Sequence, residues 1–346
     1  MNVAVFCHSI LSDWHDRGVH LLRGVASELV ARRHRVRVFE PRDGTSVRGL
    51  LAETGAQGLL GFRRAYPSLR PTRYDPRDFD LDAALDGADL VFVDESADPE
   101  IVRAIGGHRV RAHAQLFFRA SSPRAAAAIT NLAGYDAVLA RTRTVADALR
   151  AFGWTRELTV WHDAADTRLF HPRPSGPHLR DLVWVGGYGP RLPELLFEPV
   201  RRLNLRARVY GAGWPGPAIT ECERSGIEFA GYVPDHEVPG VLAGARVTVD
   251  FPNGAPSVHA FEALACGIPL VVADGIDPVR LFRPGIELLP ARDGVEMARQ
   301  IRTILDDSEL ARCVAVAGRR AVLMRHTCAH RADEVLALAS SRCAAA

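Results

Sequence analysis

A single acidic side chain, Glu262, interrupts the otherwise small and apolar segment PSVHAFEALACGIPLVV at residues 256–272. Ser257 is a favourable helix N-cap and Gly267, followed by Ile-Pro, is a favourable stop, so we expect a helix over 258–266. The start of such a helix offers unpaired N–H groups and a partial positive charge, which suit an anion such as a diphosphate. A carboxylate about one turn further in can accept two hydroxyl hydrogens, as from a ribose. The alternative interpretation is an acid that only complements the helix dipole.

Strand and helix patterns alternate on both sides of this segment. An apolar run at 2–7, a helical spacing of apolar residues at 19–30 and a second apolar run at 35–39 predict a βαβ opening. The stretch HPRPSGPHLR at 171–180 indicates a linker, after which the pattern restarts. We therefore expect two α/β halves, each a parallel sheet, with ligands at the carboxyl ends of strands that face a central cleft. The expected parts are an amino-terminal domain (1–170), the linker (171–180), a carboxyl-terminal domain (181–325) and a last helical segment (326–346) that packs back on the first domain.

Composition narrows the function classes. The net charge of +2 argues against bulk nucleic-acid binding. All 43 basic residues are arginine, so arginine, histidine or backbone N–H groups must bind any phosphate. The 6 cysteines form no C-x-x-C pair, and no apolar stretch is long enough for a membrane helix or a signal peptide. These features predict a cytoplasmic protein with reduced thiols, and no zinc spacing, Walker loop or nucleophile elbow is present.

Five segments, in the same order along the chain, resemble GT-B glycosyltransferases. ACGIPLVV with Glu262 before it is similar to their donor-site segment. The other four are HSILSDWHDRGVHLLRGVASELVARRHRVRVFEP (8–41), AADTRLFHP (164–172), GYVPDHEVPGVLAGARVTVDF (231–251) and GRRAVLMRHTCAHRADEVL (318–336). The first and last of these four resemble the CgeB-like branch, the spore-maturation type of glycosyltransferase. The resemblance implies a GT-B fold, in which two Rossmann-like domains face a central cleft.

The resemblance also implies roles for particular residues. Glu262 would hold the ribose of a nucleotide-sugar donor, and the backbone at Tyr232 and Val233 would meet the base. The diphosphate would meet N–H groups at the start of the helix, and the GGYGPR loop would line the cleft. The donor-binding candidates are thus Glu262, His259, Val258, Ser257, Tyr232, Val233, Gly187 and Arg191. No metal and no cofactor beyond the co-substrate would be needed, because helix termini and basic side chains carry the leaving-group charge.

Three positions depart from the family pattern. Gly254 stands where many relatives carry a second acid, and His259 stands where the CgeB-like branch commonly has arginine. The branch often has a run rich in His and Asp after its fourth strand, but this chain has LFFRASSP at 116–123. A retaining transfer can use the departing phosphate as the base, whereas an inverting transfer needs a protein base. The last departure therefore favours retention or loss of activity.

Other polar groups are weaker candidates for chemistry. His15 and Asp16, in the loop at 12–16 after the first strand, and His162, at the end of a later strand, are positioned to deprotonate an acceptor; the alternative is that they are capping or surface residues. The segment RRAYPSLRPTRYDPRD at 63–78 has five arginines. It is either a grip for an anionic acceptor, such as a glycan phosphate or nucleic acid, or a solvated loop whose aspartates offset the charge.

The predicted function is transfer of a sugar from a nucleotide-diphosphate sugar to a glycan, protein or small-molecule acceptor, without metal and with retention. One alternative is a catalytically silent sugar-nucleotide-binding protein. The other is an NAD-dependent oxidoreductase, because GAGWPG at 211–216 satisfies G-x-G-x-x-G. Pro215 in the motif and Pro217 after it remove N–H donors from the phosphate cradle, so a tight turn is the favoured interpretation of that motif. The base, sugar, acceptor and oligomeric state stay open.

Overall fold

The structure is a computed structural model, and it describes residues 1–108, 114–124, 132–174, 180–252, 255–273 and 281–343. The chain forms two compact units. Unit 1 comprises Met1–His162 and Cys328–Ala346, and unit 2 comprises Asp163–Thr327. In the described residues no helix has the length and apolar content needed to cross a bilayer.

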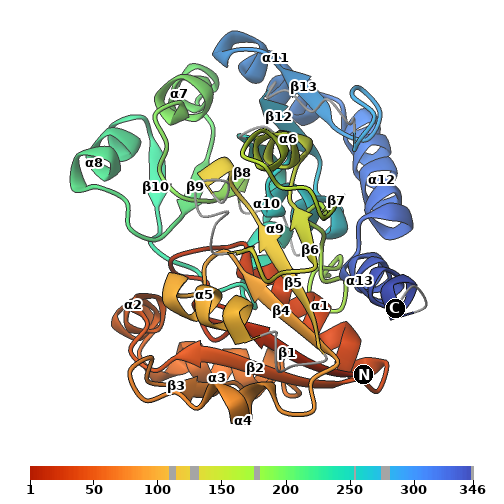
Figure 1. The fold of residues 1–346 in the computed structure, drawn as a ribbon. Helices are drawn as coiled ribbons and strands as arrows, with labels where there is room; N and C mark the ends of the chain where they lie inside the picture. The colour runs from red at the N-terminus through yellow and green to blue at the C-terminus, as the bar shows by residue number, and fades with distance from the viewer. Residues whose placement is uncertain (109–113, 125–131, 175–179, 253–254, 274–280, 344–346) are drawn as a thin grey trace. The chain divides into compact units, whose positions relative to one another are not determined.

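Unit 1 contains a parallel sheet in the order β3-β2-β1-β4-β5-β6-β7 (Figure 1). Its strands are β1 (Asn2–Phe6), β2 (Arg35–Pro41), β3 (Thr72–Tyr74), β4 (Leu90–Asp94), β5 (Gln115–Ala120), β6 (Ala137–Ala140) and β7 (Glu157–Val160). Its helices are α1 (Val19–Ala31), α2 (Thr45–Thr54), α3 (Ala56–Ala65), α4 (Leu81–Leu85), α5 (Pro99–His108), α6 (Arg143–Ala151) and α13 (Cys328–Cys343). The order reverses direction between β1 and β4, as in doubly wound folds.

Unit 2 contains a second parallel sheet, in the order β10-β9-β8-β11-β12-β13. Its strands are β8 (Arg180–Val185), β9 (Ala207–Tyr210), β10 (Ile227–Phe229), β11 (Ala245–Asp250), β12 (Leu270–Ala273) and β13 (Leu289–Ala291). Its helices are the π-helical turn η3 (Pro193–Phe197), α7 (Glu198–Leu203), α8 (Gly216–Arg224), α9 (Val238–Ala243), α10 (Val258–Ala265), α11 (Gly294–Asp306) and α12 (Ser308–Arg325).

Apolar residues on both faces of the central strands explain why unit 2 folds as a covered parallel sheet. On β8, Leu182 and Trp184 belong to one core cluster, while Val183 and Val185 belong to the cluster on the opposite face. Strands buried on both faces are typical of parallel sheets with helices on each side. Because both faces of β8 are packed, the carboxyl end of the strand has a fixed position. The loop after β8 therefore starts from a fixed point.

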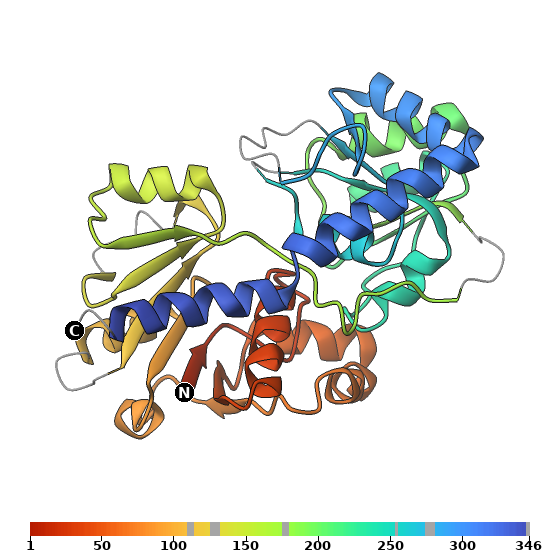
Figure 2. The same ribbon diagram turned by 90° about the vertical axis from the view of Figure 1, so that its right-hand side faces the viewer.

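The last helix, α13, belongs to unit 1 and packs against α1 (Figures 1 and 2). The indole Nε1 of Trp161 donates to the carbonyl of Arg331 at 3.2 Å, and Arg32 pairs with Asp333 at 2.6 Å. Unit 1 therefore includes a helix that is distant in sequence from its strands.

The boundary between the units lies earlier than the predicted linker. Unit 1 gives way to unit 2 after His162, so segment 163–170, which we expected in the amino-terminal domain, belongs to unit 2. Phe170 explains this, because its buried ring is part of the unit 2 core. Of the predicted linker, residues 175–179 lie outside the described part of the chain.

Candidate functional site

Six of the eight predicted donor-binding residues lie in the loop after β8 or in the loop and helix after β11, the two strands between which the order of the unit 2 sheet reverses. The chain runs from β8 outward through β9 to β10, then continues on the other side of β8 with β11, β12 and β13. Ligands of open α/β sheets bind outside the carboxyl ends of strands at such a point. Gly187 and Arg191 follow β8, and the start of α10 follows β11. The topology therefore brings these residues to one edge of one sheet.

Glu262 lies in the second turn of α10, a helix whose side chains are all buried. Its exposed fraction is 1%. Burial raises the pKa of the neighbouring Cys266 thiol to about 12, and the negative charge of Glu262 contributes to that rise. Because α10 has no acid in its first turn, complementing the helix dipole does not account for Glu262. A buried carboxylate is costly unless hydrogen bonds or a bound group compensate for its lost hydration.

The start of α10 is held by Asp250 at the end of β11, a residue that the sequence analysis did not select. The carboxylate of Asp250 accepts the backbone N–H of Ser257 at 3.1 Å and its hydroxyl at 2.5 Å. Ser257 is the N-cap residue, but its side chain makes no hydrogen bond to the helix. The predicted N-cap position is thus confirmed, but the Ser257 hydroxyl donates to Asp250 and does not bond to the helix. The N–H that we had assigned to a diphosphate is also donated within the chain.

His259 links α10 to the sheet through its ring. The ring Nε2 lies 3.0 Å from the hydroxyl oxygen of Thr248, which in turn donates to the carbonyl of Val183 at 2.6 Å. Since that hydroxyl proton is already committed, Nε2 must carry the hydrogen and donate it to Thr248. The ring of His259 therefore holds α10 against β11 and β8. The role toward a diphosphate that we predicted for His259 is that of its backbone N–H group, not of its ring.

The remaining donor-binding candidates differ in exposure. Val233 is buried in the unit 2 core, whereas Tyr232 is partly exposed. Arg191 is exposed and, within the described residues, makes no side-chain hydrogen bond or ion pair. A Cβ added at Gly187 would meet nothing within 4 Å. Gly187 and Arg191 thus offer open space and an unengaged cation beside the end of β8. Gly254 lies outside the described residues.

The GAGWPG segment is explained by the packing of its own tryptophan. The indole Nε1 of Trp214 donates to the carbonyl of Gly186 at 3.0 Å. A Cβ added at Gly211 would lie 2.1 Å from that carbonyl oxygen and 2.4 Å from the indole nitrogen. The first glycine of the motif is therefore required by a close approach within the chain, and no dinucleotide is needed to account for it.

We expect Gly211→Ala to destabilise unit 2 by about 3 kcal/mol, because the backbone carbonyl of Gly186 cannot move aside cheaply. Urea unfolding followed by tryptophan fluorescence measures the change. Gly216→Ala is the matched control within the same motif, since an added Cβ there meets nothing within 4 Å. Equal stability of the two variants would contradict this explanation of the motif.

In unit 1 the loop between β1 and α1, residues 7–18, is fixed by a buried carboxylate. Glu40, at the end of β2, has an exposed fraction of 0%. Its Oε2 accepts the N–H groups of Ile10 at 2.7 Å and Leu11 at 3.2 Å, and the hydroxyl of Ser9 at 3.3 Å. Burial raises the pKa of Glu40 above its ordinary value, and these donors offset part of that rise. The loop thus takes one shape set by a strand some 30 residues away in sequence.

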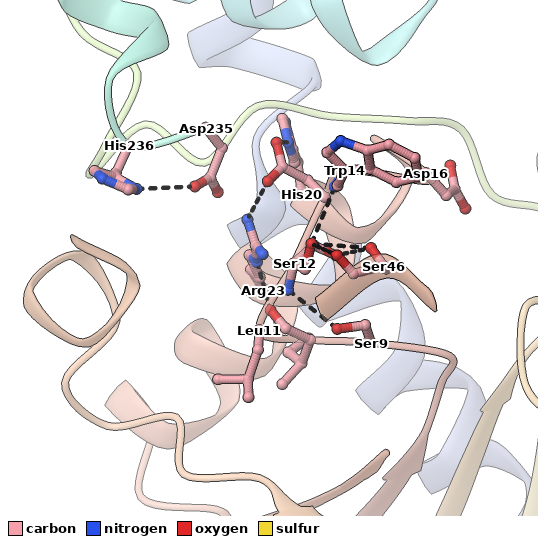
Figure 3. Close-up of polar contacts among 12 residues, drawn as sticks. Ser9, Leu11, Ser12, Trp14, Asp16, His20, Arg23, Ser46, Asp235 and His236 are labelled. Carbon is pink, nitrogen blue, oxygen red and sulfur yellow. Dashed lines mark hydrogen bonds and ion pairs between the residues drawn. The ribbon is translucent and has the colours of Figure 1, made fainter. Parts of the chain in front are cut away.

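A buried ion cluster ties the same loop to α1 (Figure 3). The Oδ2 of Asp13 lies 2.9 Å from the Nε2 of His20, and its Oδ1 lies 3.7 Å from the Nη1 of Arg23. The Nε of Arg23 donates to the carbonyl of Ile10 at 2.7 Å. All three charged or titratable side chains are almost fully buried, so the loop and helix are joined by contacts that exclude water.

Two of the three candidates for acceptor chemistry in unit 1, Asp16 and His162, have a side-chain atom hydrogen-bonded within the chain. His15 is exposed, and its ring centroid lies 5.8 Å from that of His8, which the sequence analysis did not select. The Oδ1 of Asp16 accepts a backbone N–H of its own loop at 2.7 Å. The Nδ1 of His162 donates to the carbonyl of Arg141 at 3.0 Å. The structure therefore brings His8 and His15 together, and it places His162 on a different strand end.

The pKa of His8 lies below its ordinary value of 6.5, because the ring is half-buried and the charge of His15 opposes protonation. The unfolded chain therefore binds a proton at His8 more readily than the folded chain does. Stability should fall as the pH drops from about 6.5 toward the lower pKa of the folded state. We expect the melting temperature of His8→Gln to fall less between pH 7.5 and pH 5.5 than that of the parent chain. An identical fall in both proteins would contradict this assignment.

The LFFRASSP run, which has no acid of its own, is paired with acids from the neighbouring strand. Asp94 and Arg119 form a buried ion pair at 2.8 Å between the ends of β4 and β5. The carboxylate of Glu95 accepts the hydroxyl of Ser121 at 2.7 Å and the N–H of Ser122 at 2.9 Å. The DESAD sequence after β4 was the available signal for these acids. In the described residues no group of three or more His, Cys, Asp or Glu side chains is arranged to hold a metal ion.

The carboxyl-terminal part of the chain, residues 191–337, matches the family described as glycosyl transferase-like. No curated protein matches the chain in sequence. Among similar solved structures, HepE from Anabaena in complex with UDP-glucose is 16% identical, with a TM-score of 0.73 over 99% of this chain and 100% of that chain. Sucrose-phosphate synthase from Thermosynechococcus elongatus is also 16% identical, with a TM-score of 0.72 over 100% of both chains. TarM from S. aureus, in a complex containing UDP, is 10% identical, with a TM-score of 0.69 over 98% of this chain and 100% of that chain.

The solved structures confirm the predicted α/β fold class, with two Rossmann-like parallel sheets. The family match covers the segment that includes Glu262, His259 and Tyr232. These matches do not confirm the predicted membership of the CgeB-like branch. The chain has the GT-B fold, and its residues 191–337 are similar to the glycosyl transferase-like family.

Proposed function

We propose that the protein transfers a sugar from a nucleotide-diphosphate sugar to an acceptor hydroxyl, without a metal and with retention of anomeric configuration. The observation that carries the proposal is the buried Glu262 in the second turn of α10, within the segment similar to glycosyltransferases. UDP-sugars are the first donors to test, because HepE is similar in fold and was solved with UDP-glucose.

In the proposed complex Glu262 accepts the two ribose hydroxyl hydrogens, and the backbone at Tyr232 and Val233 meets the base. N–H groups at the start of α10 and the guanidinium of Arg191 stabilise the charge that develops on the diphosphate. Asp250 and the His259 ring hold α10 in place for this purpose.

The reaction exchanges one bond to the anomeric carbon for another. The acceptor oxygen bonds to that carbon while the bond to the diphosphate oxygen breaks. The acceptor proton passes to the departing phosphate, so the products are a glycoside and a nucleoside diphosphate. His15 and Asp16 orient the acceptor in this scheme. Membership of the CgeB-like branch and a cytoplasmic location stay predictions.

The direct test is release of nucleoside diphosphate from UDP- and GDP-sugars, alone and with candidate acceptor glycans. We expect one donor to be hydrolysed or transferred, a rate that EDTA does not change, and a product whose anomeric configuration, read by NMR, equals that of the donor. Loss of activity with EDTA would overturn metal independence, and an inverted product would overturn retention.

The second candidate function is sugar-nucleotide binding without turnover. It is favoured by the contacts of Asp16 and His162, each of which has a polar side-chain atom already hydrogen-bonded within the chain. Calorimetric titration with UDP-glucose, followed by a search for UDP release from the bound donor, separates the two functions. Binding with no release from any donor supports the silent protein, and release excludes it.

A further inference from the structure

Unit 1 contains a pocket of about 580 Å³, formed by α3, the segment after it and β3. Its lining includes Phe62, Tyr66 and Leu11, and three arginines, Arg63, Arg70 and Arg73. Among the described residues, no acidic side chain lines it. The volume is that of an ordinary small-molecule site, which is commonly apolar with a few polar groups that orient the ligand.

Two of the three arginines are unengaged. The Nε of Arg73 lies 3.7 Å from the Oε1 of Glu40, and its guanidinium also donates to the carbonyl of Arg42. Within the described residues, the side chains of Arg63 and Arg70 make no hydrogen bond or ion pair. The aspartates expected to offset the charge of this segment do not pair with them; Asp75 instead accepts the N–H of Arg77 at 3.0 Å. The pocket therefore carries positive charge that the described side chains leave uncompensated.

Packed aromatic rings lie behind the apolar side of the pocket. Phe62 and Tyr66 are buried, with ring centroids 5.3 Å apart. The guanidinium carbon of Arg23 lies 5.1 Å and 5.6 Å from these two ring centroids. Because Arg23 is also part of the ion cluster with Asp13, these rings are packed against the loop after β1. The side chains behind the pocket are thus held by contacts within unit 1.

The pocket also shares a residue with the loop that carries the acceptor candidates. Leu11 lines the pocket and belongs to the same loop as His15 and Asp16. In Figure 3 its side chain points away from Trp14 and Asp16. The loop therefore presents an apolar side chain to the pocket on one side and polar groups on the other.

We propose that this pocket binds the anionic end of the acceptor, a phosphate ester joined to an apolar chain or ring. The inference rests on the proposed glycosyl transfer and names its acceptor class. Guanidinium groups bind phosphate through paired, charge-assisted hydrogen bonds, and the partly exposed side chains of Leu11 and Leu59 contact the adjoining apolar part. A neutral glycan leaves the arginines without a partner, and bare phosphate leaves these two leucines uncovered. A pocket that encloses one group, in a chain of net charge +2, fits a single phosphate ester better than the extended backbone of a nucleic acid.

Calorimetric titration of the full chain tests the proposal with octyl phosphate, kept below its micelle concentration, as the probe. We expect octyl phosphate to bind at least about tenfold more tightly than inorganic phosphate or octyl glucoside. Arg63→Gln and Arg70→Gln should each weaken its binding about tenfold. Arg64→Gln is the matched control, an exposed arginine on the same helix outside the pocket lining, and should bind as the parent does.

Several results would overturn the proposal. One is that octyl glucoside or inorganic phosphate binds as tightly as octyl phosphate. Another is that Arg64→Gln weakens octyl phosphate binding as much as Arg63→Gln and Arg70→Gln do, or that neither of these two variants weakens it. The last is that a single-stranded oligonucleotide binds more tightly than octyl phosphate and displaces it. Since Arg63 and Arg70 are exposed, the variants should keep the parent melting temperature. UDP-glucose titrations of the same proteins distinguish the two levels of inference. Donor binding without octyl phosphate binding contradicts the pocket alone, whereas octyl phosphate binding without any nucleotide-sugar binding or turnover contradicts the glycosyltransferase function.

Discussion

Replacement of Glu262 by glutamine should weaken the binding of the nucleotide-sugar donor about 100-fold or more. Glutamine keeps the volume of the side chain inside α10 but removes the charge from both proposed hydrogen bonds to the ribose. Hydrogen bonds to a charged group contribute about 1.5–3 kcal/mol each, and about 1.4 kcal/mol corresponds to a factor of ten in affinity. Calorimetric titration with the donor that gives the highest turnover measures the change.

Two further variants make this test specific to the carboxylate. Glu262→Asp keeps the charge on a shorter side chain, so it should bind the donor with an affinity between those of the parent and Glu262→Gln. Glu221→Gln, on the exposed part of α8, should bind as the parent does. A folded Glu262→Gln protein with parental donor affinity would contradict the central role of this residue.

Replacement of Arg23 by methionine should lower the stability of unit 1 by about 3–5 kcal/mol, which for a unit of this size is a fall in melting temperature of about 10 °C. The change leaves the Asp13 carboxylate buried without its guanidinium and removes the donor to the Ile10 carbonyl. It also removes the cation beside the rings of Phe62 and Tyr66. Calorimetric melting of the full chain measures the effect.

A surface pair provides the comparison for this prediction. Arg32 and Asp333 are joined at 2.6 Å, but their side chains are 28% and 67% exposed. Exposed ion pairs contribute about 0–1 kcal/mol, so Arg32→Met should change the stability little. The double variant Arg23→Met/Asp13→Asn should recover part of the loss, because it no longer leaves a lone buried charge. An Arg23→Met loss no larger than that of Arg32→Met would show that the buried cluster does not stabilise the loop.

Local sequence signals predicted α10 and the central strands well, because spacing and stop residues act within a few positions. The predicted helix 258–266 became Val258–Ala265, and the apolar run at 2–7 became the strand Asn2–Phe6. The secondary structure of the segment at 63–78 did not follow from its sequence. The sequence indicates either a binding segment for an anionic acceptor or a solvated loop, whereas the segment contains the end of α3 and the strand β3. The three residues of β3 are too few for a periodic signal, and they are strand only because they pair with β2.

The parts of the site that sequence reasoning missed depend on contacts between distant segments. Glu40 anchors Ile10 across 30 positions, and nothing near either residue in the sequence indicates the other. Arg119 meets Asp94 because β5 pairs with β4 in a register that sets these two residues opposite each other. A register of this kind is decided by the whole sheet, so an acid apparently missing from one strand was supplied by its neighbour.

The return of α13 to unit 1 has a consequence for how the protein is made. The strands of unit 1 leave the ribosome long before residues 328–343, whereas unit 2 is continuous in sequence. While unit 2 is being synthesised, the surface of α1 that α13 later covers is still exposed. The Trp161 indole also still lacks its carbonyl partner, Arg331. Unit 2 can therefore complete its fold as an insert before the half that begins the chain does, and nascent chains halted before residue 328 should expose a patch that chaperones bind.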